Sequence, residues 1–363
     1  GKYRIIDFTL ANCLHSGLRR ILVLTQYKSH SLQKHLRDGW SIFNPELGEY
    51  ITPVPPQMRV GERWYSGTGD AIYHNLYLLE RSEADYVLVL SGDHIYRMDY
   101  AAMLEAHRAN QAAVTVACMH VPVDEASAFG VMRVDGQQRI VDFQEKPAQP
   151  AALPNDPSHA LASMGIYVFS MELLLSTLRA DHTRSDSEHD FGKNLIPYMV
   201  PRYRVVAHRF SESCVGCEGV EPYWRDVGTV DAFWEANIDL AGIVPDLNLY
   251  DKSWPIWTHQ EQLPPAKFVF DNDDRRGMAI DSMVSGGCVI SGATVRHSVL
   301  FSNVKINSFA TLEDAVVLPD VVIGRHARLK KVVIDKSCLI PEGLEVGYDR
   351  ERDAKSFYVS PGG

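Results

Sequence analysis

The C-terminal part of the chain carries a repeat of apolar residues that few folds can accommodate. From about residue 281 onward, apolar residues recur every six residues, with occasional steps of five. The series is Val289, Val295, Phe301, Ile306, Leu312, Val317, Ile323, Leu329, Ile334 and Ile340. Three steps bring the pattern back after about 17 residues. This period is typical of a β-helix, whose stacked three-sided coils bury the inward residues. The alternative is an antiparallel β domain, although alternation with period two is weak here.

The first 245 residues show a different pattern, in which short apolar runs alternate with helix-like segments. The runs are RRILVLTQY (19–27), DYVLVLSGD (85–93) and AAVTVACMHV (112–121). The segment GTGDAIYHNLYLLERS, between the first two, has apolar residues at helical spacing after a start that offers an N-cap. Continuous apolar strands separated by helices predict a doubly wound α/β domain with a largely parallel sheet. We expect this domain over 1–245, a proline-punctuated linker over 246–280 and the β-helix over 281–363.

The composition is that of a globular protein long enough for two domains, with 363 residues, of which 45% are hydrophobic and 23% charged. No apolar run approaches the roughly 18 to 20 residues that a membrane span needs, and the N-terminus does not resemble a signal peptide. We therefore expect a cytoplasmic protein with no membrane partner. The formal net charge of -10 argues against a nucleic-acid partner, but leaves room for a small anion in a locally basic pocket.

The six cysteines are scattered along the chain, which is typical of reduced intracellular thiols. Cys214 and Cys217 have the spacing of metal ligands, but no second such pair follows. We therefore expect a loop with two free thiols rather than a zinc site.

The apolar run at 86–90 ends on Ser-Gly-Asp-His, where Asp93 follows Gly92. In a doubly wound sheet, the residues just after a strand line the crevice in which ligands bind. A glycine there lets a ligand approach the backbone, and the Asp93 carboxylate is a hard oxygen ligand suited to Mg²⁺. The alternative is an ordinary turn, because Gly-Asp often ends a strand.

A second acid, Asp226, lies between an aromatic pair and a Val-Gly-Thr turn in EPYWRDVGT. Two carboxylates from distant loops could share one metal, whose charge would offset the charge that develops on a phosphoryl group. Asp226 could instead cap the following helix. Lys146, in FQEKPA, is a candidate point charge for a phosphate, or else part of a solvated turn.

Several segments together resemble the bacterial glucose-1-phosphate adenylyltransferases. In chain order these are GTGDAI, SGDHIYRMDY, ASAFGVM, FQEKPA, SMGIYVF, HDFGKNLIP, EPYWRDVGT and MVSGGCVISG. The similarity covers essentially the whole chain. Some of the motifs occur across sugar-phosphate nucleotidyltransferases, whereas WYSGTGDAI, SMGIYVF and YWRDVGT with a hexapeptide β-helix are more specific. The resemblance implies a Rossmann-like nucleotidyltransferase domain with a mostly parallel sheet, followed by a left-handed parallel β-helix.

The resemblance also implies the reaction and its residues. The reaction is transfer of an adenylyl group from ATP to glucose 1-phosphate, giving ADP-glucose and pyrophosphate for glycogen synthesis. The catalytic residues would be Asp93, Lys146 and Asp226, with Mg²⁺ held by Asp93 and Asp226. The glucose 1-phosphate contacts would be Tyr65, Gly130, Glu145, Lys146 and Ser163, and the nucleotide contacts Gln57, Gly67 and Thr68. The Trp64-Tyr65 pair could instead be aromatic packing under a loop, and Gly69 stands where the family usually has Ala.

The family's glycine-rich phosphate loop, GGxGxRL, would precede Gly1. From the resemblance we therefore expect the chain to be a fragment, inactive by itself and poorly soluble because the sheet lacks a strand. The C-terminus also stops short of the family's final segment.

The resemblance further implies a homotetramer regulated by anionic metabolites. By motif position, Arg4, Arg81 and Lys336 match effector-binding basic residues, and Gln26 and Trp64 lie in segments that relay activation. Lys336 stands where an arginine is familiar, so bidentate phosphate recognition would be lost there. A solvated surface charge is the alternative for each basic residue.

Three other functions remain open at this point. A non-catalytic regulatory subunit would be expected to lose the metal acids or the sugar-phosphate lysine, whereas Asp93, Lys146 and Asp226 are present. An acyltransferase would place a catalytic histidine in the β-helix, where we expect His297 and His326 to face solvent. A nucleotidyltransferase using another base is the nearest alternative.

Overall fold

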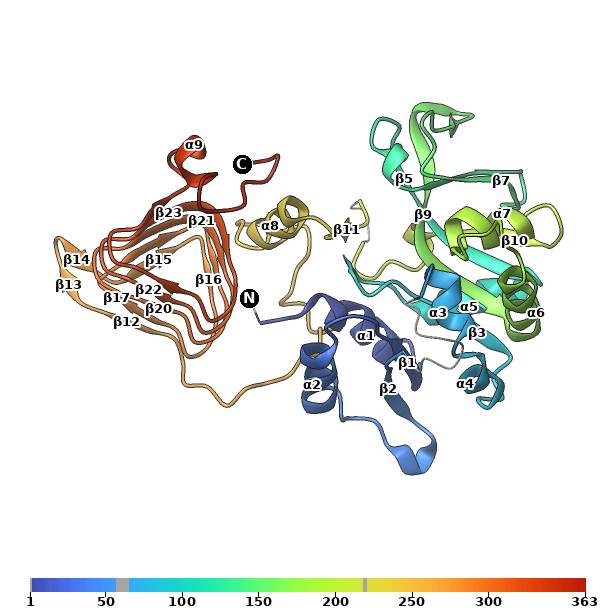
Figure 1. Cartoon of the computed structure of the whole chain (residues 1–363), viewed down its shortest axis with the longest axis horizontal. Helices are drawn as coiled ribbons and strands as arrows, with labels where there is room; N and C mark the ends of the chain where they lie inside the picture. Colours follow the sequence, from blue (N-terminus) through green and yellow to red (C-terminus); the bar gives the residue numbers. More distant parts are fainter. Residues whose placement is uncertain (1, 57–64, 218–220) are drawn as a thin grey trace. The chain divides into compact units, whose positions relative to one another are not determined.

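The computed structural model describes residues 2–56, 65–217 and 221–363, and it divides into two compact units (Figure 1). Unit 1 comprises Gly1–Phe8, Asp93–Tyr96 and Tyr223–Gly363, and unit 2 comprises Thr9–Gly92 and Arg97–Pro222. Asp93 and the strand that follows it therefore belong to the same unit as the C-terminal coils. The domain limits expected at 245 and 280 stay a prediction.

Of the described residues, unit 2 contains most of the helices and the two longest strands. Its helices are α1 (Ile5–His15, which begins in unit 1), α2 (His30–Gly39), α3 (Thr68–Tyr73), α4 (Leu76–Glu80), α5 (Tyr100–Ala109), α6 (Met171–His182) and α7 (Ile196–Met199). Its strands are β1 (Arg20–Leu24), β2 (Tyr50–Val54), β3 (Tyr86–Val89), β5 (Val114–Pro122), β6 (Gly130–Val134), β7 (Ile140–Glu145), β8 (Ala152–Leu153), β9 (Asp156–Ser170) and β10 (Val205–Arg209). The strands predicted within 19–27, 85–93 and 112–121 are confirmed as β1, β3 and β5.

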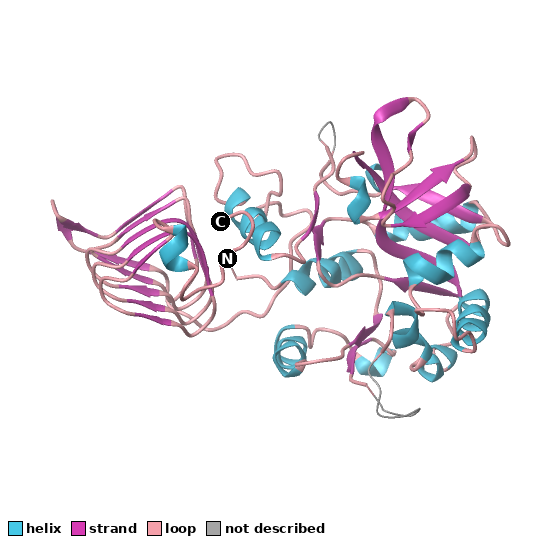
Figure 2. Ribbon diagram, turned by 45° about the horizontal axis from the view of Figure 1, so that its top comes forward, coloured by secondary structure: helices cyan, strands magenta, loops and turns pink. Residues whose placement is uncertain are grey.

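The main sheet of unit 2 is mixed, so the prediction of a mostly parallel sheet is wrong. Its central path is β10-β5-β9-β6-β7, in which only β10 and β5 pair in parallel. The long strand β9 is antiparallel to each of its partners, β3 among them. Strands β6 and β7 form a hairpin that turns at Asp135-Gly136, and such a short connection forces antiparallel pairing. Figure 2 shows these strands in magenta.

The helix expected over GTGDAIYHNLYLLERS is divided into α3 and α4 at His74 and Asn75. The backbone of Asn75 leaves the helical region, and its side-chain amide donates hydrogen bonds to the Ala71 carbonyl and the Tyr65 hydroxyl. An asparagine amide that competes for backbone groups in this way ends a helix locally. The residue preceding α3 is Gly67, which offers no side-chain cap.

Unit 1 consists largely of short strands wound into coils. Its elements are β4 (His94–Tyr96), β11 (Trp224–Asp226), α8 (Val230–Asp239), β12 (Lys267–Val269), β13 (Asp271–Asn272), β14 (Arg275–Arg276), β15 (Met278–Ile280), β16 (Met283–Val284), β17 (Val289–Ser291), β18 (Thr294–Arg296), β19 (Val299–Leu300), β20 (Lys305–Ile306), β21 (Thr311–Val317), β22 (Val322–Ile323), β23 (Arg328–Ile334), β24 (Leu339–Ile340), β25 (Glu345–Val346) and α9 (Arg350–Asp353).

The predicted β-helix is confirmed by the pairing of these strands. One parallel sheet runs β12-β17-β20-β22-β24, and strands β18, β21 and β23 form successive rungs of a second one (Figures 1 and 2). Ile306 pairs with Ile323, which pairs with Ile340 in the next coil, as the 17-residue period predicts. In the first coil, however, Ile306 pairs with Ile290 rather than Val289, because that coil is one residue shorter. The inward residue there is Ile290, which is fully buried.

Candidate active site

Two carboxylates predicted to share a metal lie together in unit 1. Strand β11 pairs antiparallel with β4, so that Asp226 is directly opposite His94, the neighbour of Asp93. The Val227 amide donates a hydrogen bond to the Asp93 carbonyl at 3.4 Å, which ties the two chain segments together. Ligand atoms of Asp93, His94 and Asp226 all lie within 4.8 Å of one another, and both carboxylates are exposed. The geometry therefore suits a divalent cation that prefers oxygen ligands and retains several waters.

His94 belongs to this cluster but was missed by the sequence reasoning, although it follows Asp93 directly. Its Nε2 is 3.5 Å from Asp93 Oδ1, and its ring packs edge-on against Trp224 with centroids 4.8 Å apart. Burial lowers the pKa of His94, against the opposing effect of the Asp93 and Asp226 charges. Burial therefore favours the neutral form of the imidazole beside the two acids.

Of the residues matched to glucose 1-phosphate, Gly130, Glu145 and Lys146 lie in unit 2, in or next to the paired strands β6 and β7. Gly130 is directly opposite Glu145 in this hairpin. A Cβ atom on Gly130 would lie 2.5 Å from Phe143 Cζ and 2.8 Å from Glu145 Oε2. A side chain at this position would therefore clash first with the Phe143 ring and then with the Glu145 carboxylate. Lys146, which follows Glu145, has a left-handed φ of 46° and donates its backbone N–H to the Phe129 carbonyl at 3.0 Å.

Glu145 lies beside further polar groups. Burial raises its pKa, and the nearby Asp190 charge acts in the same direction. Ser163 is 8% exposed on β9 and hydrogen-bonds with Tyr167, a tyrosine whose pKa is raised chiefly by burial. Asp190 and Tyr167 were missed as site residues, although both lie in segments that carry the family resemblance, HDFGKNLIP and SMGIYVF. Unit 2 thus brings Glu145, Ser163, Tyr167 and Asp190 into one polar neighbourhood.

The turn that contains Gly67 and Thr68 packs against the segment at 188–191. Thr68 Oγ1 donates to Asp190 Oδ2 at 2.9 Å and accepts from the Phe191 N–H at 3.1 Å. A Cβ on Gly67 would lie 2.4 Å from the Glu188 carbonyl oxygen, so the turn approaches this backbone closely. The Tyr65 hydroxyl accepts from Asn75. Gln57 and Trp64 fall outside the described residues, and the nucleotide-binding role of Gly67 and Thr68 stays a prediction.

The residues matched to effector binding are solvent-exposed in their own units. Arg4 and Lys336 belong to unit 1, and Arg81 to unit 2, where its guanidinium lies 5.8 Å from the Tyr77 ring centroid. Gln26, just after β1, is also exposed. Their regulatory roles stay a prediction.

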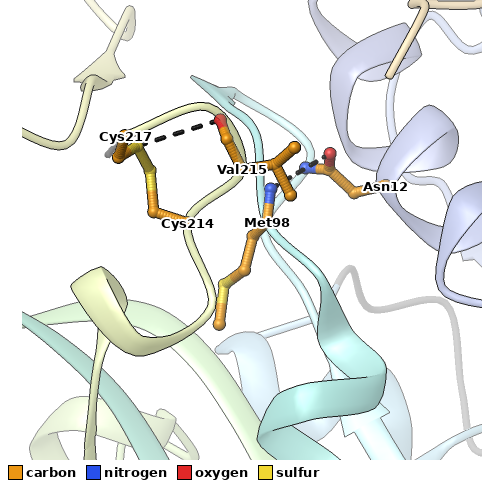
Figure 3. Close-up of a disulfide and its surroundings, with 5 residues drawn as sticks. All are labelled: Asn12, Met98, Cys214, Val215 and Cys217. Atoms are coloured by element: carbon orange, nitrogen blue, oxygen red, sulfur yellow. Dashed lines mark hydrogen bonds between the residues drawn. A yellow bond between two sulfur atoms is a disulfide. The ribbon is translucent and has the colours of Figure 1, made fainter. Parts of the chain in front are cut away.

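Cys214 and Cys217 are joined by a disulfide (Figure 3), so the expectation of two free thiols is wrong. Their Cα atoms are 5.9 Å apart, within the range that a disulfide spans. Paired sulfurs cannot act as thiolate ligands, so the structure also holds no zinc half-site here. Cys214 also forms an isolated antiparallel β-bridge with Met98, and the Met98 N–H donates to Asn12 Oδ1 at 3.2 Å. The free cysteines are Cys13, Cys118, Cys288 and Cys338.

The two histidines of the β-helix have partners within it. His297 Nδ1 is 2.6 Å from Asp314 Oδ1, and the His326 ring stacks on Phe309. His326 is exposed and His297 partly so, as expected. In the described part of the chain, no helix is both long and apolar enough to cross a membrane.

Comparison with known proteins finds matches along the whole chain. Residues 1–242 match the family model described as nucleotidyl transferase, and residues 264–363 match that described as GlmU-like, C-terminal hexapeptide. Proteins named glucose-1-phosphate adenylyltransferase from Nitrosospira multiformis and Nitrosomonas europaea are each 59% identical to the chain. The alignments cover the whole chain and 85% and 84% of these relatives. A protein of the same name from Dechloromonas aromatica is 57% identical, over the whole chain and 83% of its own length. The chain therefore belongs to the glucose-1-phosphate adenylyltransferase family of nucleotidyl transferases.

Proposed function

We propose that the protein transfers an adenylyl group from ATP to glucose 1-phosphate. A phosphate oxygen of the sugar attacks the α-phosphorus of ATP, and the bond from that phosphorus to the pyrophosphate oxygen breaks, so that ADP-glucose and pyrophosphate form. The observation that carries the proposal is the Asp93–Asp226 pair, found in a chain whose full-length relatives bear the name of this activity. No protein nucleophile is needed, because phosphoryl transfer depends mainly on positioning and charge stabilisation.

Asp93 and Asp226 would hold the divalent cation, which we propose to be Mg²⁺. When bound, the ion supplies positive charge against the phosphate oxygens. The two carboxylates supply oxygen ligands, and the neutral His94 beside them adds no competing positive charge. The two carboxylates would thus fix the position of the cation.

The sugar phosphate would bind through the residues around the β6–β7 hairpin. Lys146 provides a point charge for the phosphate, whereas Glu145 and Ser163 offer hydrogen bonds to sugar hydroxyls. The raised pKa of Glu145 reflects a partly desolvated carboxylate, which gains more from hydroxyl donors than an exposed one does. Gly130 lets the Glu145 carboxylate lie close to the backbone, and Tyr65 would contact the hexose from the turn before α3. Gln57, Gly67 and Thr68 would contact the nucleotide.

We further propose a cytoplasmic homotetramer that makes ADP-glucose for glycogen synthesis. Anionic metabolites would regulate it through Arg4, Arg81 and Lys336. These proposals follow from the family and from the exposed positions of the three basic residues.

The test is pyrophosphate release from glucose 1-phosphate with ATP, UTP and dTTP in turn. The native enzyme is used, and Asp93→Asn is compared with Asp124→Asn, a change at an exposed acid elsewhere. We expect ATP-selective turnover that falls about 100-fold or more in Asp93→Asn and is unchanged in Asp124→Asn. Selective turnover with UTP or dTTP would mean that this nucleotide, rather than ATP, is the substrate. Absence of turnover with every nucleotide in a folded tetramer would favour the regulatory-subunit function.

A further inference from the structure

The helix after Asp226 connects this carboxylate to the β-helix within unit 1. Asp226 Oδ1 accepts the Gly228 N–H at 2.8 Å, so the turn after the strand orients the carboxylate. Thr229 caps α8, since its Oγ1 accepts the Ala232 N–H at 3.1 Å. The carboxylate, the turn and the first turn of α8 therefore form one hydrogen-bonded segment. A displacement of α8 would be passed on to Asp226.

The apolar face of α8 packs on the wall of the β-helix. Ile238 and Ala241, at and just after its end, form a buried cluster with Val299, Phe301 and Val316 of the coils. Figure 1 shows α8 beside the coils that contain β16 and β21. This packing holds the C-terminal part of the helix. Phe233 and Trp234 pack against the same cluster from the preceding turn of the helix.

Trp234 adds the directional contact. Its indole Nε1–H donates to the Asp314 carbonyl oxygen at 2.8 Å. Asp314 is at a corner of the β-helix, where its φ is 51°, and the corner residues one coil before and after it, His297 and Lys331, also have positive φ values. His297 Nδ1 contacts the Asp314 carboxylate at 2.6 Å, which holds this corner.

The C-terminal residues of the chain form hydrogen bonds with the first turn of α8. Ser360 Oγ donates to one carboxylate oxygen of Asp231, and the Gly362 N–H donates to the other at 3.1 Å. The hydrogen bond from Ser360 is the main cause of the lowered pKa of Asp231. Lys331 Nζ donates to the Gly362 carbonyl at 2.6 Å and lies 5.3 Å from the Trp234 ring centroid. Asp231 is in the first turn of α8, five residues after Asp226.

We propose that Trp234 is a positioning residue for Asp226. Through the Asp314 carbonyl it sets the rotation of α8 on the β-helix, and thereby the orientation of the carboxylate that binds the cation. The Ser360–Asp231 contact acts on the same helix from its first turn. This inference rests on the metal role of Asp226 in the proposed function. Mg²⁺ and Mn²⁺ bind well only when their ligands are correctly placed, so a small rotation of the helix weakens binding.

The test measures cation binding directly, with Mn²⁺ as the probe and the EPR signal of free Mn²⁺ as the readout. The variants are Trp234→Phe, which removes the indole N–H but keeps a ring, and Ser360→Ala, which removes one of the two hydrogen bonds to Asp231. Trp257→Phe is the matched control, because Trp257 lies in unit 1 outside α8 and is 43% exposed. Asp226→Asn reports the metal role itself. Circular dichroism establishes that each variant is folded.

We expect the Mn²⁺ Kd to rise at least fivefold in Trp234→Phe and in Ser360→Ala, at least tenfold in Asp226→Asn, and not at all in Trp257→Phe. In the active enzyme, the Mg²⁺ concentration for half-maximal rate should rise in Trp234→Phe while KM for glucose 1-phosphate stays constant. A contact that only stabilised the fold would not raise the Mg²⁺ requirement while leaving KM for glucose 1-phosphate constant. An unchanged Kd in Ser360→Ala and in any folded Trp234→Phe, with a raised Kd in Asp226→Asn, would overturn the inference and leave the proposed function intact. An unchanged Kd in Asp226→Asn would overturn the metal role, and this inference with it.

Discussion

Replacement of Gly130 by alanine should damage the proposed sugar-phosphate site by a steric effect that can be worked out from the structure. The added Cβ would lie 2.5 Å from Phe143 Cζ and 2.8 Å from Glu145 Oε2, whereas ordinary contacts are 3.4–4 Å. The φ of Gly130 is not in the left-handed region, so backbone strain contributes nothing to this effect. Gly192 approaches the same carboxylate, since a Cβ on Gly192 would also clash with Glu145 Oε2. The Glu145 carboxylate therefore lies close to the backbone at both glycines.

The magnitude has two parts. To reach 3.4 Å, the Phe143 ring must withdraw by about 0.9 Å, and because this ring is 5% exposed within the core we expect a destabilisation of about 1–3 kcal/mol. The Glu145 oxygen must move by about 0.6 Å, and because a displacement of about 1 Å can cost 100-fold, we expect KM for glucose 1-phosphate to rise at least about 10-fold. Both effects come from one methyl group, so they should appear together.

The assay measures KM for glucose 1-phosphate and the Tm of Gly130→Ala beside Gly136→Ala. Gly136 lies in the turn of the same hairpin, and a Cβ added to it would have no atom within 4 Å. Alanine there should leave KM unchanged and alter stability by less than about 1 kcal/mol. A KM in Gly130→Ala within twofold of the original value would refute the steric argument, whatever its Tm.

Three further predictions concern the rest of the chain. Alkylation of the unfolded, unreduced chain should label four of its six cysteines, and six labels by mass spectrometry would contradict the Cys214–Cys217 disulfide. Reduction of this bond should lower the free energy of unfolding by no more than about 2 kcal/mol, because the closed loop is very short. Ile323→Ala, in the fully buried centre of the coils, should lower the free energy of unfolding by about 3–5 kcal/mol in denaturant titrations, and a loss below about 1 kcal/mol would mean that the site is not packed. Burial lowers the pKa of His107 to about 4. Its contribution to the free energy of unfolding is therefore complete above about pH 6.5 and is lost progressively as pH falls toward 4. His107→Gln should remove up to about 3 kcal/mol of this pH dependence, and an equal pH dependence in the variant would exclude His107 as its source.

Much of the candidate site could be inferred from local pattern. Asp93 was predicted because it follows an apolar strand, and Asp226 because an acid precedes a turn and a helix. The structure brings these two acids together through the pairing of β4 and β11. His94 and Asp190 were not predicted. His94 follows Asp93 in an ordinary strand position, and Asp190 becomes a neighbour of Glu145 only through folding.

The sequence by itself determined the β-helix, the positions of the main strands and the two acids. A repeat of 17 residues requires stacked coils, and apolar runs mark buried strands, because both signals depend on residues that are close in the chain. Tertiary structure alone decided the direction of β9, the inward position of Ile290 in the first coil and the break before α4 at Asn75. Strand direction depends on which distant strand supplies the hydrogen-bond partner, and apolar runs buried on both faces look the same in parallel and antiparallel sheets.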